Sequence, residues 1–257
     1  HVYPVGALTQ GLKGERLTEM AELFDAGCVV FGQPDGLLSN LRILMQAMHY
    51  ASTFDFSVWL RPQEISLTHH GVAHDGEVAT RLGLPTIPIC SETIAISNII
   101  LLMKETGVKE HLCRISSPEG LSMIRDAKQQ GLPVTCDVTI NHLHLSDMDI
   151  GFFDSNCHLM PPLRSFSDRD ALRHGLLDGT IDAVCSDHAP VDEDAKLLPF
   201  GQAEIGATGV ELLLSLTLKW GLEMRLPLLK TLSKITCDSA QILGINAGNL
   251  SVGKAAD

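Results

Sequence analysis

The chain has 257 residues, 45% of them apolar, which is enough for one large domain with a sizeable core. Its formal net charge of −12 and pI near 5.3 argue against nucleic acid or an anionic membrane as the main partner. The seven cysteines stand singly, without a CxxC pair, which argues against a disulfide scaffold or a zinc ribbon. No stretch is apolar and long enough to cross a bilayer. We therefore expect a cytoplasmic protein.

Short β-rich runs alternate with amphipathic stretches along the chain, the pattern of a parallel sheet covered by helices. Strands are predicted over residues 2–8, 28–31, 56–60, 111–115, 133–138 and 181–185. Helices are predicted over residues 15–26, 41–53, 76–82, 92–106, 118–130 and 168–177, with a helical tail over 210–220, 226–235 and 239–243.

These six βα units follow one another without a linker, low-complexity tract or charge run. We therefore predict a single α/β domain over residues 1–257, and this length is typical of a barrel. Six strands do not close an eight-stranded barrel, and an open sheet would expose two apolar edges. We expect the first two βα units to lie outside this chain, which then carries barrel strands 3 to 8 and the C-terminal helices.

The last predicted strand ends in a carboxylate, an imidazole and a proline, at Asp187, His188 and Pro190. The C-terminal tips of barrel strands carry the chemistry of such folds. Asp187 is therefore predicted at the mouth of the barrel, where it could hold a metal or act as a base. The plainer interpretation is that Asp187 caps the following turn and that His188 is a packed core histidine.

Several motifs, in the right order along the chain, resemble class I dihydroorotases. They are PVGALT and GLKG at 4–14, RLGL at 81–84, MPPLR at 160–164, DGTIDA at 178–183, SDHAP at 186–190 and ILG at 242–244. The resemblance covers essentially the whole chain. It implies a (β/α)8 TIM barrel of the amidohydrolase superfamily, whose members hydrolyse cyclic amides or related bonds with metal-bound water.

Most of the metal ligands that this resemblance implies are missing. The HxH pair that the family places on its first strand does not occur in this chain. Pro34 stands at the position of a carboxylate ligand, with Asp35 displaced by one residue. Arg61 and Arg114 stand where two histidine ligands belong. Only Asp187, on the eighth strand, matches.

Arginine offers no lone pair and keeps its positive charge where a dication would sit. Arg61 and Arg114 should therefore oppose zinc, and we expect no metal cofactor. His111, three residues before Arg114, is not the ligand match. On the substrate side Met160 replaces an asparagine and Val191 a histidine, which removes hydrogen-bond partners from a cyclic diamide-carboxylate ligand.

The other histidines are weaker candidates. His142 and His144 have strand spacing, but the family has two adjacent histidines here that are not metal ligands, and Asn141 replaces the first. A metal role for His142 is therefore not favoured. The loop after the third predicted strand carries three more histidines: His69, His70 and His74. These either form a surface metal site or lie in a solvated loop, and the solvated loop is the favoured interpretation.

The leading hypothesis is a dihydroorotase-like pseudoenzyme of pyrimidine biosynthesis in which Asp187 is vestigial. By resemblance, its partner would be aspartate carbamoyltransferase, in a hetero-oligomer. The main rival is an active zinc-dependent dihydroorotase whose reduced metal site combines Asp187 with histidines from outside this chain. A third hypothesis is an anion-binding module in which Arg61 and Arg114 clamp a carboxylate or phosphate. Either arginine could instead pair with Asp187 and fill the metal position with an ion pair.

Overall fold

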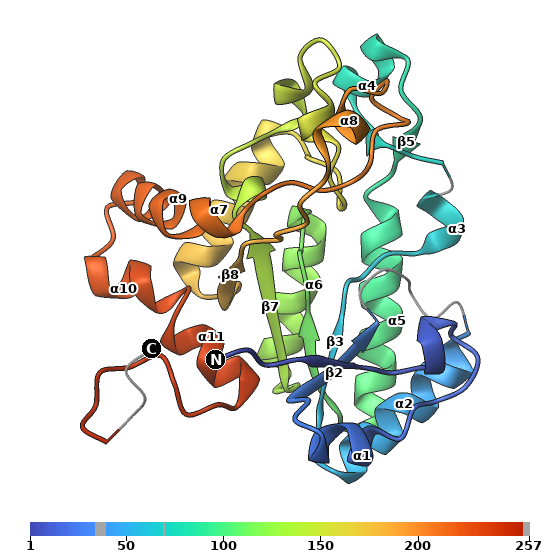
Figure 1. Cartoon of the computed structure of the whole chain (residues 1–257), viewed down its shortest axis with the longest axis vertical. Helices are drawn as coiled ribbons and strands as arrows, with labels where there is room; N and C mark the ends of the chain where they lie inside the picture. The colour runs from blue at the N-terminus through green and yellow to red at the C-terminus, as the bar shows by residue number, and fades with distance from the viewer. Residues whose placement is uncertain (34–39, 69, 254–257) are drawn as a thin grey trace.

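A computed structural model describes residues 1–33, 40–68 and 70–253. Its centre is a six-stranded sheet in the order β1-β2-β3-β6-β7-β8, and all neighbouring strands are parallel (Figure 1). The strands are β1 (Val5–Ala7), β2 (Val30–Gln33), β3 (Ser57–Leu60), β6 (Lys109–Leu112), β7 (Val134–Thr139) and β8 (Ala183–Cys185). The order in the sheet follows the order in the chain, as in a (β/α)8 barrel.

The helices between the strands cover one face of this sheet (Figure 1). They are α1 (Met20–Asp25), α2 (Leu41–Thr53), α5 (Cys90–Thr106), α6 (Pro118–Gln129) and α7 (Phe166–Asp178). The tail forms α9 (Val210–Glu223), α10 (Leu228–Ser233) and α11 (Cys237–Leu243). Among the described residues, no helix is long and apolar enough to cross a membrane.

The strands β4 (Ala73–His74) and β5 (Thr86–Ile87) form a separate two-stranded sheet beyond the carboxyl ends of the main strands. Short helices surround it: α3 (Ile65–Thr68), α4 (Glu77–Leu82) and α8 (Glu193–Lys196), with the 3-10 turns η1 (Gln10–Leu12), η2 (Asn141–Leu143), η3 (Asp147–Ile150) and η4 (Ser155–Cys157). A small apolar cluster that includes Val78, Leu159 and Phe200 supports this region. These segments form a cap over one side of the barrel mouth.

All six predicted strands form, several with shifted or shorter bounds: the strand predicted over 2–8 is Val5–Ala7, and that over 181–185 is Ala183–Cys185. Two further differences have a visible cause. The strand predicted over 111–115 is Lys109–Leu112, because Arg114 has a φ of 59° and cannot continue an extended ladder. The helix predicted over 15–26 begins only at Met20. Leu17 forms a β-bridge with Thr9 instead, so the preceding residues belong to a loop that returns to β1.

The main core lies between the sheet and its helices. Helix α2 shows why: Leu44, Ala47, Met48 and Ala51 recur at helical spacing and are all buried. Along β6 and β7 alternate residues point the same way, so Leu112 and Cys136 join this core. The side chains between them point to the opposite face of the sheet, which we call the inner face.

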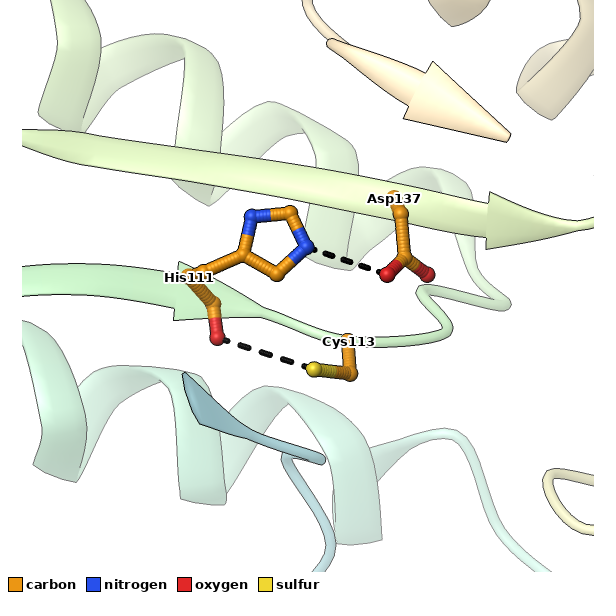
Figure 2. A group of neighbouring side chains, drawn as sticks. All are labelled: His111, Cys113 and Asp137. Carbon is orange, nitrogen blue, oxygen red and sulfur yellow. Dashed lines mark hydrogen bonds and ion pairs between the residues drawn. The ribbon is translucent and has the colours of Figure 1, made fainter. Parts of the chain in front are cut away.

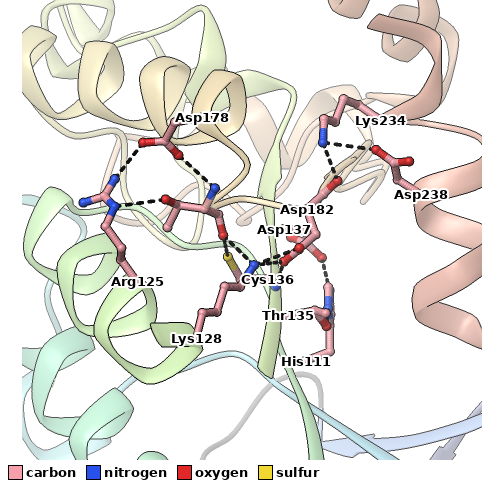
Figure 3. Close-up of polar contacts among 11 residues, drawn as sticks. His111, Arg125, Lys128, Thr135, Cys136, Asp137, Asp178, Asp182, Lys234 and Asp238 are labelled. Carbon is pink, nitrogen blue, oxygen red and sulfur yellow. Dashed lines mark hydrogen bonds and ion pairs between the residues drawn. The ribbon is translucent and has the colours of Figure 1, made fainter. Parts of the chain in front are cut away.

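Polar contacts hold the amino-terminal ends of the strands together (Figure 3). Lys128 on α6 places Nζ 2.6 Å from Oδ2 of Asp182, just before β8. The same carboxylate accepts a hydrogen bond from the backbone N–H of Cys136 on β7 at 2.8 Å. Lys234 donates to the carbonyl oxygen of Asp182 at 3.2 Å. One aspartate therefore links α6, β7 and the C-terminal helices.

Candidate functional site

Arg114 and Asp187 meet at the barrel mouth, beyond the carboxyl ends of β6 and β8. Nη1 of Arg114 lies 2.8 Å from Oδ1 of Asp187, and the two side chains are only 20% and 14% exposed. This is a close, largely desolvated pair of opposite charges. The sequence left two alternatives for the arginines: an anion clamp or an ion pair with Asp187. For Arg114, the structure contains the ion pair.

Both partners of this pair have an unusual backbone. Arg114 has a φ of 59° and Asp187 a φ of 48°, the left-handed region that favours glycine. The turn at Arg114 is held by its own backbone N–H, which donates to Oδ1 of Asp137 at 2.7 Å. Because β6 stops in this turn, the Arg114 guanidinium can reach across the mouth to the tip of β8.

Arg61 follows β3 and lines the same space. One cavity of about 490 Å³ is bordered by Arg61, Arg114 and Asp187. A second, of about 390 Å³, is bordered by these three residues together with Gln63 and Met160. Nε2 of Gln63 donates to the sulfur of Met160 at 3.3 Å. The residues singled out from the sequence as an anion clamp and as an altered substrate contact therefore border common cavities.

The side chains at the family's metal positions do not fit zinc. Asp187, the one matching ligand, already has its carboxylate bound to a permanent cation. Arg61 and Arg114, at the two histidine positions, both line the cavity that a metal would share with Asp187. A dication there would meet repulsion as well as the loss of two nitrogen ligands. Pro34 and Asp35 lie outside the described residues.

His142 is a neutral, fixed core histidine. Its Nδ1 lies 2.7 Å from the Thr139 hydroxyl and its Nε2 lies 3.2 Å from the carbonyl oxygen of Pro162. Burial lowers its pKa to about 4. The spacing of His142 and His144 is not that of a strand, because residues 141–143 form the 3-10 turn η2. Among the described residues, His142 does not lie in a group of three or more potential metal ligands, so a metal role for it is not supported.

His74 corrects the prediction of a solvated histidine loop, because it is buried in β4. Nη1 of Arg164 lies 3.1 Å from its Nδ1, and Oδ2 of Asp168 lies 3.8 Å from its Nε2. Arg164 also donates to the carbonyl oxygen of Ile87 on β5 at 3.0 Å. Burial, with the Arg164 charge, lowers the pKa of His74. His70 is exposed, and His69 lies outside the described residues.

His188 is exposed and is not the packed core histidine considered from the sequence. Its Nδ1 accepts a hydrogen bond from the backbone N–H of Gly209 at 3.2 Å, at the start of α9. The first N–H groups of a helix have no partner within the helix. His188 therefore connects the tip of β8 to the beginning of α9.

One group of chemically active side chains was missed from the sequence. His111, Cys113 and Asp137 lie together on the inner face, with Nε2 of His111 3.0 Å from Oδ2 of Asp137 (Figure 2). The signal was the alternation of polar residues in the two runs, His111 with Cys113 and Thr135 with Asp137. Side chains two residues apart share one face of a strand. The two runs come together because β6 pairs with β7, and this pairing and its register could not be predicted from the sequence.

Solved structures match this fold. An L-hydantoinase (dihydropyrimidinase) from Arthrobacter aurescens superposes with a TM-score of 0.85 at 24% identity, over 99% of this chain and 59% of that one. A D-hydantoinase (dihydropyrimidinase) from Thermus sp. gives a TM-score of 0.80 at 21% identity, over 98% of this chain and 58% of that one. The predicted fold class is confirmed: the six strands are part of an amidohydrolase-type (β/α)8 barrel.

Comparison with known sequences gives a more specific likeness than the fold does. Residues 1–120 match the Dihydro-orotase-like family and residues 143–257 the Amidohydrolase family. A "Dihydroorotase-like protein" of Pseudomonas putida is 44% identical over 100% of this chain and 60% of its own length. A "Dihydroorotase" of Citrifermentans bemidjiense is 38% identical over 100% of this chain and 61% of its own length.

These matches show that the chain is similar, along its whole length, to dihydroorotases and dihydroorotase-like proteins of the amidohydrolase superfamily. It spans about 60% of the length of the curated relatives that it matches.

Proposed function

We propose that the protein is a non-catalytic, dihydroorotase-like protein of pyrimidine biosynthesis. The observation that carries this proposal is the ion pair between Arg114 and Asp187. The carboxylate that would ligate a catalytic metal is bound by a cation, and that cation stands at the position of another ligand. Zinc-activated water is the nucleophile that the superfamily's chemistry requires, and the described residues at the family's metal positions do not fit a zinc ion that would activate it.

Hydrolysis of dihydroorotate by the complete protein, with zinc added, tests this proposal. We expect no turnover above the uncatalysed rate. The Asp187→Ala variant serves as the control, because a contaminating hydrolase would leave wild type and variant equally active. Turnover that Asp187→Ala abolishes would contradict the proposal. In that case the rival hypothesis holds, an active zinc-dependent dihydroorotase with a reduced metal site.

The partner proposed for this non-catalytic barrel is aspartate carbamoyltransferase, in a cytoplasmic hetero-oligomer. Two observations support this proposal: the family resemblance of the sequence motifs and the match to dihydroorotase-like relatives along the whole chain. We expect the two complete proteins to co-elute from gel filtration as one species larger than either. We also expect the transferase to lose activity or assembly when the barrel is omitted. Separate elution, with a fully active transferase alone, would contradict the partnership.

Anion binding at the mouth is a second candidate function, favoured by the position of Arg61 and Arg114 around one cavity. Calorimetric titration with orotate and with inorganic phosphate tests it. We expect binding that Arg61→Gln weakens at least tenfold. Arg125→Gln is the matched control, because Arg125 pairs with Asp178 on the outside of the barrel. Equal binding by both variants, or none by wild type, would contradict an anion site at the mouth.

A further inference from the structure

The polar group on the inner face has the composition of a metal site. It contains an imidazole, a thiol and a carboxylate: His111 and Cys113 on or just after β6, and Asp137 on β7 (Figure 2). One ligand atom from each lies within 4.8 Å of the other two. In a tetrahedral zinc site, bond lengths of about 2.0–2.3 Å set the ligand atoms roughly 3.5 Å apart. The widest separation would need to contract by up to about 1.3 Å to hold such an ion, whereas Nε2 of His111 and Oδ2 of Asp137 are already 3.0 Å apart.

Second contacts already orient two of these ligands. Nδ1 of His111 lies 2.8 Å from the hydroxyl of Thr135, which leaves Nε2 facing Asp137. Oδ1 of Asp137 accepts the backbone N–H of Arg114 at 2.7 Å, while Oδ2 faces His111. A partner on the far nitrogen of a histidine ligand is a regular feature of protein metal sites, because it fixes the ring and its tautomer.

A further soft donor stands beside the group. The sulfur of Cys185, at the end of β8, lies 3.3 Å from Oδ1 of Asp137. His111 and Asp137 are 1% and 6% exposed, while Cys113 and Cys185 are half-buried and border the mouth cavity, through which an ion could enter. Thiolate with imidazole is a ligand combination that suits zinc and cobalt rather than magnesium or calcium.

We propose that the inner face binds one zinc-type divalent ion through His111, Cys113 and Asp137, with Cys185 available as a fourth ligand. Binding would release the proton of each ligating thiol. None of these ligands stands at a position where the family resemblance implies a metal ligand. Cys113, Asp137 and Cys185 border the same cavity as Arg114 and Asp187, so the proposed ion would lie at the base of the mouth. It would be a structural ion that joins β6, β7 and β8, and it does not depend on whether the mouth is catalytic.

Loading the complete protein with cobalt tests the proposal. We expect about one cobalt per chain and a thiolate-to-cobalt charge-transfer absorption band. Cys113→Ser should lose most of this band. Cys90→Ser is the matched control, because Cys90 is an exposed thiol at the start of α5. Asp187→Asn is the second control and should keep the band, since Asp187 is not one of the proposed ligands.

Three results would overturn the proposal: no bound cobalt, an unchanged band in Cys113→Ser, or a band lost in Asp187→Asn. If Cys113→Ser fails to fold, alkylation of the wild-type protein decides instead. Bound zinc should slow modification of Cys113 at least tenfold, measured by mass spectrometry, and leave Cys90 unchanged. Equal rates for Cys113 with and without zinc would contradict the site.

Fluorescence provides a second measurement on the folded protein. The ring of Trp59 lies 4.3 Å from the ring of His111, and the chain has only one other tryptophan, Trp220. Cobalt at His111 should quench Trp59 strongly. We expect a quenching signal that Trp59→Phe removes. Quenching that persists in this variant would place the ion elsewhere.

Discussion

The two ends of the barrel use ion pairs differently. At the mouth, Arg114 and Asp187 pair across the strand tips from two backbone positions with positive φ. At the opposite end, Lys128 and Asp182 pair between a helix and a strand start, and neither has a positive φ. Their side chains are 24% and 26% exposed, somewhat more than those at the mouth.

Strained backbone persists only where the surrounding structure holds it, and it gathers at functional sites. The mouth therefore keeps the strained backbone that is typical of a functional site, although Arg114 and Asp187 now neutralise each other's charge. The opposite end has an ordinary structural pair, in which Lys128 and Asp182 join a helix to the start of a strand. Changes at the two ends should consequently differ in size, and the four experiments below run from the largest expected effect to the smallest.

The largest effect is expected from Asp187→Ala. Removing one partner leaves the Arg114 guanidinium largely buried without its carboxylate, which costs about 3 kcal/mol of unfolding free energy. Urea unfolding of wild type and variant measures the difference. Asp192→Ala, a few residues along and exposed, is the control. Equal midpoints for Asp187→Ala and wild type would show that the ion pair at the mouth contributes nothing to the free energy of unfolding.

A gain in stability is expected from Glu110→Met. Both carboxyl oxygens of Glu110 are buried with no hydrogen-bond partner among the described residues, and burial raises its pKa well above the usual value. The native state therefore holds this proton more tightly than the unfolded state, so stability falls as pH rises above the unfolded pKa of about 4.3. The methionine should add about 2 kcal/mol at pH 8.

Urea midpoints at pH 4 and pH 8 check this expectation. Wild type should lose stability between the two values through Glu110, and Glu110→Met should lose less. The gain from the substitution should therefore be larger at pH 8 than at pH 4. An equal or reversed gain would show that the carboxyl is already satisfied in solution.

A smaller loss is expected from Lys128→Ala at the opposite end. It removes the contact to Asp182 and a hydrogen bond from Nζ to the carbonyl oxygen of Thr180 at 2.9 Å. Water reaches both partners, so the loss should be about 1 kcal/mol. Thermal unfolding measures it. A loss equal to that of Asp187→Ala would remove the contrast between the two ends.

The smallest effect is expected from Lys109→Ala. Its Nζ lies 2.7 Å from Oδ2 of Asp55, but the two side chains are 53% and 80% exposed. Exposed pairs of this kind contribute roughly 0–1 kcal/mol, and we expect a change below about 0.5 kcal/mol. The same unfolding experiment checks it. A larger loss would mean that distance, rather than burial, sets the energy of ion pairs in this protein.

Periodicity predicted the elements because local residue pattern decides them. Helix α2 begins and ends where its apolar spacing placed it, at Leu41 and Thr53. The position of Asp187 at the mouth followed from its place after an apolar strand. Local pattern failed where a distant segment decides, as at His74, which Arg164 reaches from 90 residues away. The inner-face group was missed for the same reason, because His111 meets Asp137 only through the register of β6 and β7.

The replaced metal ligands were found by family resemblance, and no periodicity would have marked them. Arginine at a strand tip is unremarkable until a histidine is expected there. The pairing itself could not be fixed, since Arg61 and Arg114 were equal candidates for Asp187. The structure distinguishes them through the positive φ of Arg114, which directs that side chain toward β8.

A double-mutant cycle on Arg114 and Asp187 tests the central claim most directly, that a cation has taken the place of the metal beside Asp187. Unfolding free energies of wild type, Arg114→Ala, Asp187→Ala and the double variant are measured with zinc and with a chelator. We expect an interaction energy of about 2 kcal/mol, the same in both conditions. An interaction near zero, or stabilisation by zinc that Asp187→Ala removes, would show that Asp187 serves a metal rather than the arginine.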